Sequence, residues 1–410
     1  MLPHKNSFRI DKDKVVYILI NYSAYGLNFL SGLILARKLG PTNRGIYAYL
    51  SNLYVVAAFL ISMNAKNASS IAQSDLIVNS NSEVNKLKII KIYLVAAAVT
   101  CILSVIYFFY LKNFLDTRLV VIFCLANLVN SLLVVIQIHE GMLRTNNELQ
   151  KLAILRFLGY GAPSLIVIVL FFFKSVEIEL LVLAQSVAVL SCFLYVSFRL
   201  KTSVEFSMEK FRENAIRTYV STALEFLIYF MPLMFVSISE DFAYIGHFVI
   251  AFGYVLISET YYQIIESKFY LSLSSSEGRK SYNAIALMKQ NVRNLFLSQL
   301  VFIPGAYLIP VLYGTDYSES TKIALILILY RFLIAIVKLS NIYFNLVLKK
   351  FKFPIIQNSV HVATAMIAFF YTELFTGRTN PWIIAVIFSS IVISLLLFVL
   401  LNKKFSKMGQ

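Results

Sequence analysis

Long apolar runs, separated by short polar connections, fill this chain from residue 15 to residue 401. A helix needs about 20 mostly apolar residues to cross the hydrocarbon core of a bilayer. The pattern therefore predicts an all-α polytopic membrane protein with about twelve transmembrane helices. A connection at residues 201–214 divides them into two six-helix bundles, residues 1–200 and residues 215–410. The predicted spans are 15–36, 45–65, 89–111, 118–140, 153–173, 180–200, 215–238, 243–271, 293–313, 321–348, 354–375 and 382–401.

Lysine and arginine are distributed unevenly between the two sets of connections. The termini and the even-numbered connections, with the adjoining helix ends, carry 27 of the 37 Lys and Arg residues, whereas the odd-numbered connections carry eight. Short cytoplasmic connections collect positive charge, so we expect both termini and the 201–214 connection to be cytoplasmic. The two remaining cations, Arg331 and Lys338, lie inside an apolar run.

Labelling of single cysteines checks this topology. In a variant without the native cysteines, we expect cysteines at Asn79 and Ser275 to react with a reagent supplied from the cytoplasm. Cysteines at Thr315 and Arg378 should react with a membrane-impermeant reagent supplied from outside. Labelling of position 275 from outside, with none at position 315, would overturn the predicted topology.

Composition agrees with the hydrophobic pattern. The 410 residues are 59% hydrophobic and 14% charged, and the mean hydropathy is +0.74. Soluble domains carry about 25% charged residues, so the composition excludes a soluble globular protein. The net charge of +16 favours anionic lipid head groups or an anionic substrate. No nucleic-acid partner is expected, because the basic residues are scattered through short connections.

The tenth predicted helix carries a polar stripe. Arg331 and Lys338 are seven residues apart, so they point along one face, about 10 Å apart along the axis. Asn345 continues this face and Asn341 lies beside it. Each cation inside a bilayer costs roughly 2.5–3.5 kcal/mol on insertion scales. The stripe therefore predicts a wet cavity or an anionic partner.

Polar residues also recur on the first and fourth predicted helices. Asn21, Tyr25 and Asn28 follow helical spacing on the first, and Asn127 and Asn130 do so on the fourth. Such residues can form hydrogen bonds between helices, each often contributing only about 0.6 kcal/mol. Alternatively, together with the cations of the tenth helix, they line a shared aqueous lumen. Both interpretations stay open at this point.

Three acidic residues fall within the predicted spans: Glu225, Glu259 and Glu266. One interpretation is structural, with one of them neutralising Arg331 or Lys338. The other is a carboxylate that titrates with H+ or binds Na+ as access to the site alternates. Glu225 is the first candidate, because it lies nearest to mid-depth by residue count.

Helix breakers recur inside the predicted spans. They include Pro163 in a Tyr-Gly-Ala-Pro stretch, Pro232, and Pro304 followed by Gly305. Proline inside a membrane helix kinks the helix and frees backbone carbonyls. These positions are equally consistent with packing kinks and with gating hinges.

Signals for catalysis and for metal binding are missing from the sequence. It contains no GxxxxGK[ST] stretch, no HExxH stretch and no arrangement that resembles a catalytic triad. The three cysteines, Cys101, Cys124 and Cys192, fall in apolar runs without the spacing of a disulfide or a metal site. No outward connection is long enough for a glycosyl-transfer site. Transport is therefore favoured over an enzymatic activity.

The connection between the first two predicted helices reads LILARKLGPTNRGIYAYLSNLY at residues 33–54. Its Ala-Arg-x-Leu-Gly-Pro end, followed by Arg-Gly-x-Tyr-Ala, resembles the Wzx-type polysaccharide-unit flippases of the multidrug/oligosaccharidyl-lipid/polysaccharide (MOP) exporter superfamily. The Leu-Tyr-Gly-x-x-Tyr stretch at 312–317 and the Asn-Ile-Tyr-Phe-Asn stretch at 341–345 resemble the same family. A fainter internal echo pairs Gly45-Ile46-Tyr47 with Gly246-His247-Phe248. The family-motif residues are Arg37, Gly40, Pro41, Arg44, Gly45, Tyr47, Tyr313, Gly314 and Tyr317.

The resemblance implies a MATE/MOP-like fold and a flippase for undecaprenyl-pyrophosphate-linked oligosaccharide repeat units. Such a protein moves these units from the inner to the outer leaflet of a bacterial inner membrane by alternating access, for O-antigen, lipopolysaccharide or another surface polysaccharide. No cofactor is expected beyond H+ or Na+ as a coupling ion. Expected partners are membrane lipids, a polysaccharide polymerase and a chain-length regulator. The path for the pyrophosphate and sugar would include Arg331, Lys338, Asn341, Asn345, Asn21, Tyr25 and Asn28.

Three other functions compete with this one. An ion-coupled multidrug antiporter of the same superfamily would need a lumen dominated by acids, whereas the charged stripe here is cationic. A flippase for peptidoglycan precursors typically has extra helices, for which 410 residues leave little room. A membrane polysaccharide polymerase or ligase usually needs a large outer loop, and none is visible.

Overall fold

In the computed structural model, all the regular structure of the described segments is helical. Apolar, helix-compatible runs dominate the sequence, and a helix satisfies its own backbone hydrogen bonds within an apolar environment. The structure describes residues 12–62, 64–66, 68–70, 72, 86–146, 148–172, 177–199, 208–239, 241–274, 281–346, 352–376 and 381–406.

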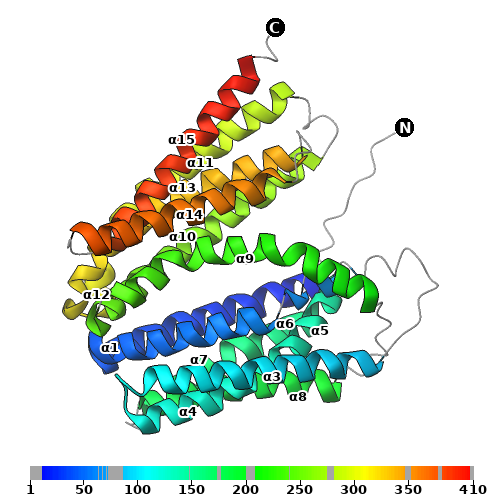
Figure 1. Ribbon diagram of the computed structural model, residues 1–410, viewed down its shortest axis with the longest axis vertical. Helices are drawn as coiled ribbons and strands as arrows, with labels where there is room; N and C mark the ends of the chain where they lie inside the picture. Colours follow the sequence, from blue (N-terminus) through cyan, green and yellow to red (C-terminus); the bar gives the residue numbers. More distant parts are fainter. Residues whose placement is uncertain are drawn as a thin grey trace. The chain divides into compact units, whose positions relative to one another are not determined.

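The chain forms two compact units, and the first contains residues 1–38 and 50–219. In this unit α3, α4 and α8 run alongside one another (Figure 1). A 3₁₀ turn, η1, joins α4 to α5, and a π-helical turn, η2, joins α6 to α7. The elements are α1 (Lys12–Ser62), α3 (Lys86–Leu111), α4 (Thr117–Leu128), η1 (Val129–Leu132), α5 (Leu133–Thr145), α6 (Leu149–Arg156), η2 (Phe157–Gly161), α7 (Ala162–Phe172), α8 (Ile178–Arg199) and the start of α9 (Met208–Ser239).

The second unit contains residues 39–49 and 220–410. Helix α13 is its central element and packs against α10, α11, α14 and α15 (Figure 1). The remaining elements are α10 (Phe242–Ser274), α11 (Ser281–Ala306), α12 (Ile309–Tyr313), η3 (Thr315–Tyr317), α13 (Ser318–Leu346), α14 (Phe353–Tyr371), η4 (Thr372–Thr376) and α15 (Pro381–Ser406). The predicted bundle boundary at residues 201–214 stays a prediction, since residues 201–207 lie outside the described ones.

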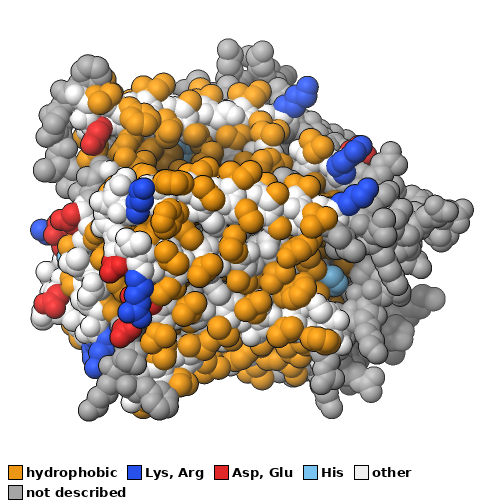
Figure 2. Space-filling model, turned by 60° about the horizontal axis from the view of Figure 1, so that its bottom comes forward, with side chains coloured by type: hydrophobic (Ala, Val, Ile, Leu, Met, Phe, Trp, Pro, Cys, Tyr) orange, Lys and Arg blue, Asp and Glu red, His pale blue; other side chains and the backbone are white. Residues whose placement is uncertain are grey.

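Within the described residues, seven helices are long and apolar enough to cross a membrane, and three shorter apolar helices accompany them. Large hydrophobic side chains are exposed all along these helices, and Figure 2 shows them covering most of one face, with charged side chains near its margins. Such a surface is suited to lipid rather than to water. The count of twelve spans and the cytoplasmic termini stay predictions.

Helix α1 contains two predicted spans, joined by a sharp break at Gly40. This residue has φ +68° and ψ 174°, outside the helical region, and Pro41 follows it directly. Glycine adopts a positive φ without steric cost, and proline fits the first turn of a new helix. The segment Leu39–Tyr49, which contains this break, belongs to the second unit, although the chain on both sides of it belongs to the first.

Candidate functional site

Arg331 is buried within the second unit. Its side chain is 1% exposed, on an apolar stretch of α13. One guanidinium nitrogen, Nη2, donates a hydrogen bond to the Tyr229 carbonyl oxygen at 3.0 Å. The guanidinium carbon lies 3.7 Å from the centre of the Tyr229 ring and 5.1 Å from that of Phe252. Aromatic faces attract a cation strongly where water is excluded, so these rings partly replace a counter-ion.

Within the described part of the chain, Arg331 makes no ion pair. Its second terminal nitrogen, Nη1, is buried without a hydrogen-bond partner among these residues. Arginine has five N–H donors in a fixed planar fork, and carboxylate or phosphate oxygens match that fork. The site therefore keeps an unused donor direction that suits an anionic oxygen.

Lys338 lies two turns further along α13 and has an acidic partner. Its Nζ is 3.7 Å from Glu266 Oε1 on α10, and the side chains are 35% and 17% exposed. Glu225 on α9 is exposed and interacts electrostatically with Lys338. The side chain of Glu259, the third candidate for ion coupling, lies outside the described residues. For Glu266 the structure supports the structural interpretation, in which one of the acids neutralises Lys338.

The Lys338–Glu266 pair predicts a pattern of compensation. Lys338→Gln or Glu266→Gln alone should lower stability by about 1 kcal/mol, because each removes the opposite charge beside a partly buried ionised group. Lys338 is about one-third exposed, which limits the effect. We expect the double variant to recover most of the loss in melting temperature. A double variant as unstable as the sum of the singles would show that the pair does not interact.

The other predicted path residues are distributed between the two units. Asn341 of α13 is half-buried, and its Oδ1 has no hydrogen-bond partner within the described chain. In the first unit, Asn28 is exposed, and the Ser164 hydroxyl donates to its Oδ1 at 3.4 Å. The side chains of Asn21, Tyr25 and Asn345 lie outside the described residues. Their place on a substrate path stays a prediction.

The polar residues of the fourth predicted span form a hydrogen-bonded chain that reaches a neighbouring helix. Asn130 Nδ2 donates to Asn127 Oδ1 at 2.8 Å, and Asn127 Nδ2 donates to Ser104 Oγ of α3 at 3.0 Å. Asn127 and Asn130 are fully buried. For Asn127 the structure supports the helix-packing interpretation, because its side chain links Asn130 to a neighbouring helix. The Oδ1 atom of Asn130 is buried without a hydrogen-bond partner among the described residues.

The family-motif residues from two distant stretches meet in the second unit. Arg44 lies over the Tyr47 ring, 5.5 Å from its centre, and interacts electrostatically with the phenol groups of Tyr313 and Tyr317. Gly314, between the two tyrosines, has φ +118° and lets α12 turn into η3. Motif residues about 270 positions apart are thus assembled into one cluster. Arg37 is exposed.

Two glycines bring the Leu39–Tyr49 segment into backbone contact with α10. A Cβ atom built on Gly45 would lie 1.6 Å from the Phe242 carbonyl oxygen. A Cβ atom built on Gly246 would lie 2.0 Å from the Pro41 carbonyl oxygen. The contact is reciprocal, because each glycine meets the residue four positions before the other. No side chain larger than hydrogen fits at either position without movement.

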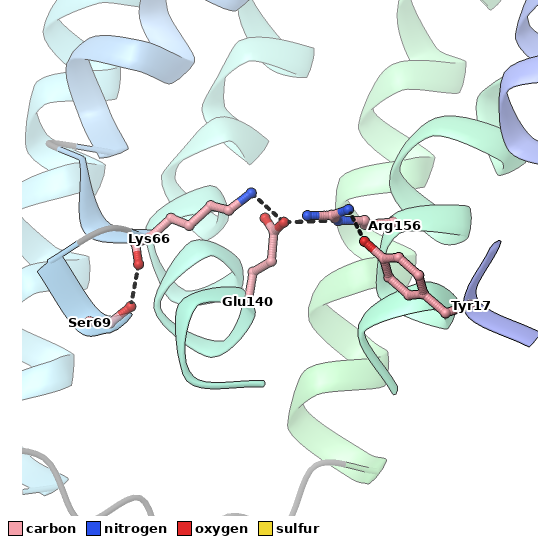
Figure 3. A network of polar contacts seen from close by, with 5 residues as sticks. All are labelled: Tyr17, Lys66, Ser69, Glu140 and Arg156. Carbon is pink, nitrogen blue, oxygen red and sulfur yellow. Dashed lines mark hydrogen bonds and ion pairs between the residues drawn. The ribbon is translucent and has the colours of Figure 1, made fainter. Parts of the chain in front are cut away.

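An ion-pair network in the first unit was missed by the sequence reasoning (Figure 3). Glu140 Oε1 accepts from Lys66 Nζ at 2.5 Å and from Arg156 Nε at 3.2 Å, and Arg156 Nη1 donates to Tyr17 Oη. Glu140 ends a predicted span, and Lys66 and Arg156 lie at predicted cytoplasmic helix ends. One acidic and two basic residues at the same predicted membrane face are a sequence signal for such pairing.

The fold and the buried polar residues define a polytopic helical membrane protein with a cation inside one unit. No family model matches the chain, and no curated protein matches its sequence. Solved structures match its fold over nearly the whole length. The lipid II flippase MurJ, in an inward closed conformation, has a TM-score of 0.74 at 14% identity, over 95% of this chain and 87% of that one.

Two further solved structures belong to the MOP superfamily. An inward-facing multidrug resistance MATE family transporter has a TM-score of 0.71 at 12% identity, over 96% of this chain and 98% of that one. A MOP superfamily transporter from Pyrococcus furiosus has a TM-score of 0.57 at 12% identity, over 98% of each chain. The chain therefore has the MOP transporter fold and is a multi-pass membrane protein. The prediction of an all-α MATE/MOP-like fold is confirmed.

Proposed function

We propose that this protein is a flippase that translocates undecaprenyl-pyrophosphate-linked oligosaccharide units across a bacterial inner membrane, for O-antigen or another surface polysaccharide. The observation that carries the proposal is Arg331: a buried cation on an apolar helix, with no ion pair and with one free donor nitrogen within the described chain. The fold supports it, because one protein with this fold is a lipid II flippase.

A pyrophosphate group is the part of such a substrate that is hardest to move. Its negative charges meet a low-dielectric region, where a fixed cation lowers the barrier far more than in water. Arginine can grip phosphate oxygens in bidentate fashion. Lys338, about 10 Å further along the same helix, is too far away to hold the same phosphate. We therefore place the two cations as successive stations on one path.

We also propose that H+ or Na+ is the coupling ion and that it is carried by Glu225, Glu259 or Glu266. The proposed protein partners are a polysaccharide polymerase and a chain-length regulator. Asn341, Asn345, Asn21, Tyr25 and Asn28 are proposed to contact the sugar or the head group.

Deletion of the gene tests the proposed function. Lipid-linked oligosaccharide should accumulate on the cytoplasmic leaflet and surface polymer should disappear, with recovery by the intact chain. Arg331→Lys keeps the charge but loses the planar fork, so we expect partial export. Arg331→Ala should lose more, and Lys338→Ala less, because its charge is closer to water and better screened. Normal export by the double alanine variant would rule out the two stations.

A multidrug antiporter is the second candidate. The structural likeness to a MATE family transporter and the acids Glu225 and Glu266 around Lys338 favour it. The same deletion strain separates the two functions. Increased sensitivity to cationic drugs with normal surface polymer would support the antiporter. Lost polymer with unchanged drug sensitivity would support the flippase.

A further inference from the structure

Helix α9 contains a proline, Pro232, well inside its length. Proline has no N–H group, so the carbonyl of the residue four positions earlier, Ile228, loses its helical hydrogen bond, and the ring pushes that carbonyl aside. In an apolar surrounding, a freed carbonyl has to find another donor.

Helix α13 supplies donors to this turn of α9. The Tyr330 hydroxyl donates to the Ile228 carbonyl oxygen at 2.6 Å. The next residue, Arg331, donates from Nη2 to the next carbonyl, that of Tyr229, at 3.0 Å. Tyr330 is 0% exposed and Arg331 is 1% exposed. Two adjacent side chains of one helix thus serve two adjacent carbonyls of another, at the turn that the proline opens.

The aromatic rings around Arg331 fix the position of its guanidinium. Tyr229 on α9 and Phe252 on α10 both present their rings to it, and their ring centres lie 6.1 Å apart in an edge-to-face arrangement. With Nη2 on the Tyr229 carbonyl, Nη1 stays without a hydrogen-bond partner among the described residues. The guanidinium is therefore bound to the turn of α9 that precedes Pro232, and it keeps one donor nitrogen for another acceptor.

We propose that Tyr330 and Arg331 form a clamp on the proline kink of α9 and are positioning residues that set the bend of this helix during transport. An anion that reaches Nη1 pulls on the same guanidinium that holds the Tyr229 carbonyl. Arrival of the head group is thereby linked to the bend of α9. This last step rests on the proposed function, whereas the clamp itself does not.

A double-mutant cycle on the purified full-length protein tests the clamp without any substrate. Tyr330→Phe removes one hydroxyl and should lower Tm by roughly 2–4 °C, the shift expected when one hydrogen bond is lost in a domain of about this size. Pro232→Ala restores an N–H donor to the Ile228 carbonyl. In the Pro232→Ala background, Tyr330→Phe should therefore have almost no effect. An equal fall in Tm in both backgrounds would overturn the clamp.

Tyr262→Phe is the matched control. Tyr262 is as deeply buried as Tyr330, and its hydroxyl accepts a hydrogen bond from the Gln299 side chain of α11. Its effect on Tm should be the same in the unaltered protein and in the Pro232→Ala background. Hydrogen exchange gives a second measurement that does not need the Pro232→Ala protein. Tyr330→Phe, and not Tyr262→Phe, should speed exchange in the turn after Ile228, and unchanged exchange there would contradict the clamp.

Substrate enters only in a third measurement. Undecaprenyl pyrophosphate should change hydrogen exchange around Pro232 in the unaltered protein, and undecaprenol should not. The response should be lost in Arg331→Gln and partly kept in Arg331→Lys. If the cycle shows coupling while undecaprenyl pyrophosphate has no effect, and deletion of the gene leaves surface polymer normal, the clamp stands and the proposed substrate is wrong. If export depends on Arg331 but the cycle shows no coupling, the clamp is wrong and the proposed function stands.

Discussion

Replacement of Gly45 or Gly246 by alanine is expected to destabilise the docking of the Leu39–Tyr49 segment on α10 and to abolish transport. Each new methyl group would meet a backbone carbonyl oxygen, 1.6 Å away at Gly45 and 2.0 Å away at Gly246. Backbone of two packed helices cannot move aside as a flexible side chain can. Overpacking typically costs about 1–3 kcal/mol and occasionally more, and we expect the upper part of that range. Melting temperature and export in the same variants are the measurements.

The same helices offer matched controls for this prediction. A Cβ atom at Gly253 of α10, or at Gly32 of α1, would have nothing within 4 Å. Alanine at these positions should be neutral or slightly stabilising, because alanine loses less backbone freedom on folding than glycine does. If Gly45→Ala were as well tolerated as Gly253→Ala, the close approach of the two backbones would not exist in the folded protein.

This contact between the two backbones gives a physical reason for the internal echo in the sequence. Gly45-Ile46-Tyr47 and Gly246-His247-Phe248 are alike in pattern, and the structure places the two glycines against each other's helices. The sequence alone indicates only that both stretches open a helix. A glycine at a helix start can serve a turn, can allow close packing or can occur there by chance. Only the contact with the neighbouring backbone identifies close packing as the reason.

Much of the helical layout could be predicted from hydrophobicity. Each of the twelve predicted ranges overlaps a helix in the described residues, and the break at Gly40 falls between the first two. The assignment of Leu39–Tyr49 to the second unit could not be predicted, because it depends on contacts with residues about 200 positions away. Periodicity describes one element at a time and says little about which unit a turn joins.

The polar stripe of α13 was predicted only in part. Helical spacing places Arg331 and Lys338 on one face, and the ion pair was one of two open interpretations for the acids. Nothing in the sequence indicates the partners of Arg331. Arg331 donates to the Tyr229 carbonyl of another helix, next to the carbonyl that loses its helical donor to Pro232. An arginine that binds a backbone oxygen needs no acidic residue in the sequence to mark it.

Replacement of Glu140 by glutamine is the second change with a large expected effect. This carboxylate accepts from Lys66 and Arg156 in the first unit, and its side chain is 17% exposed. Glutamine would leave two cations close together without the negative charge between them. Loss of one partner from a fully buried pair costs about 3–5 kcal/mol. Lys66 and Arg156 are 30% and 25% exposed, so water screens part of the repulsion between them. We therefore expect a loss of stability of about 1–3 kcal/mol.

Unfolding of purified variants, measured as Tm, checks this value and its cause. Glu140→Gln combined with Arg156→Gln leaves one cation that can reach water, so the double variant should be more stable than Glu140→Gln alone. Glu148→Gln is the matched control, because its partner Lys151 is 49% exposed in an i,i+3 pair, and it should cost less than about 0.5 kcal/mol. Equal losses for Glu140→Gln and Glu148→Gln would mean that the network around Glu140 contributes no more than an ordinary surface pair. Loss of stability in the double variant beyond that of Glu140→Gln would show that repulsion between Lys66 and Arg156 is not the cause.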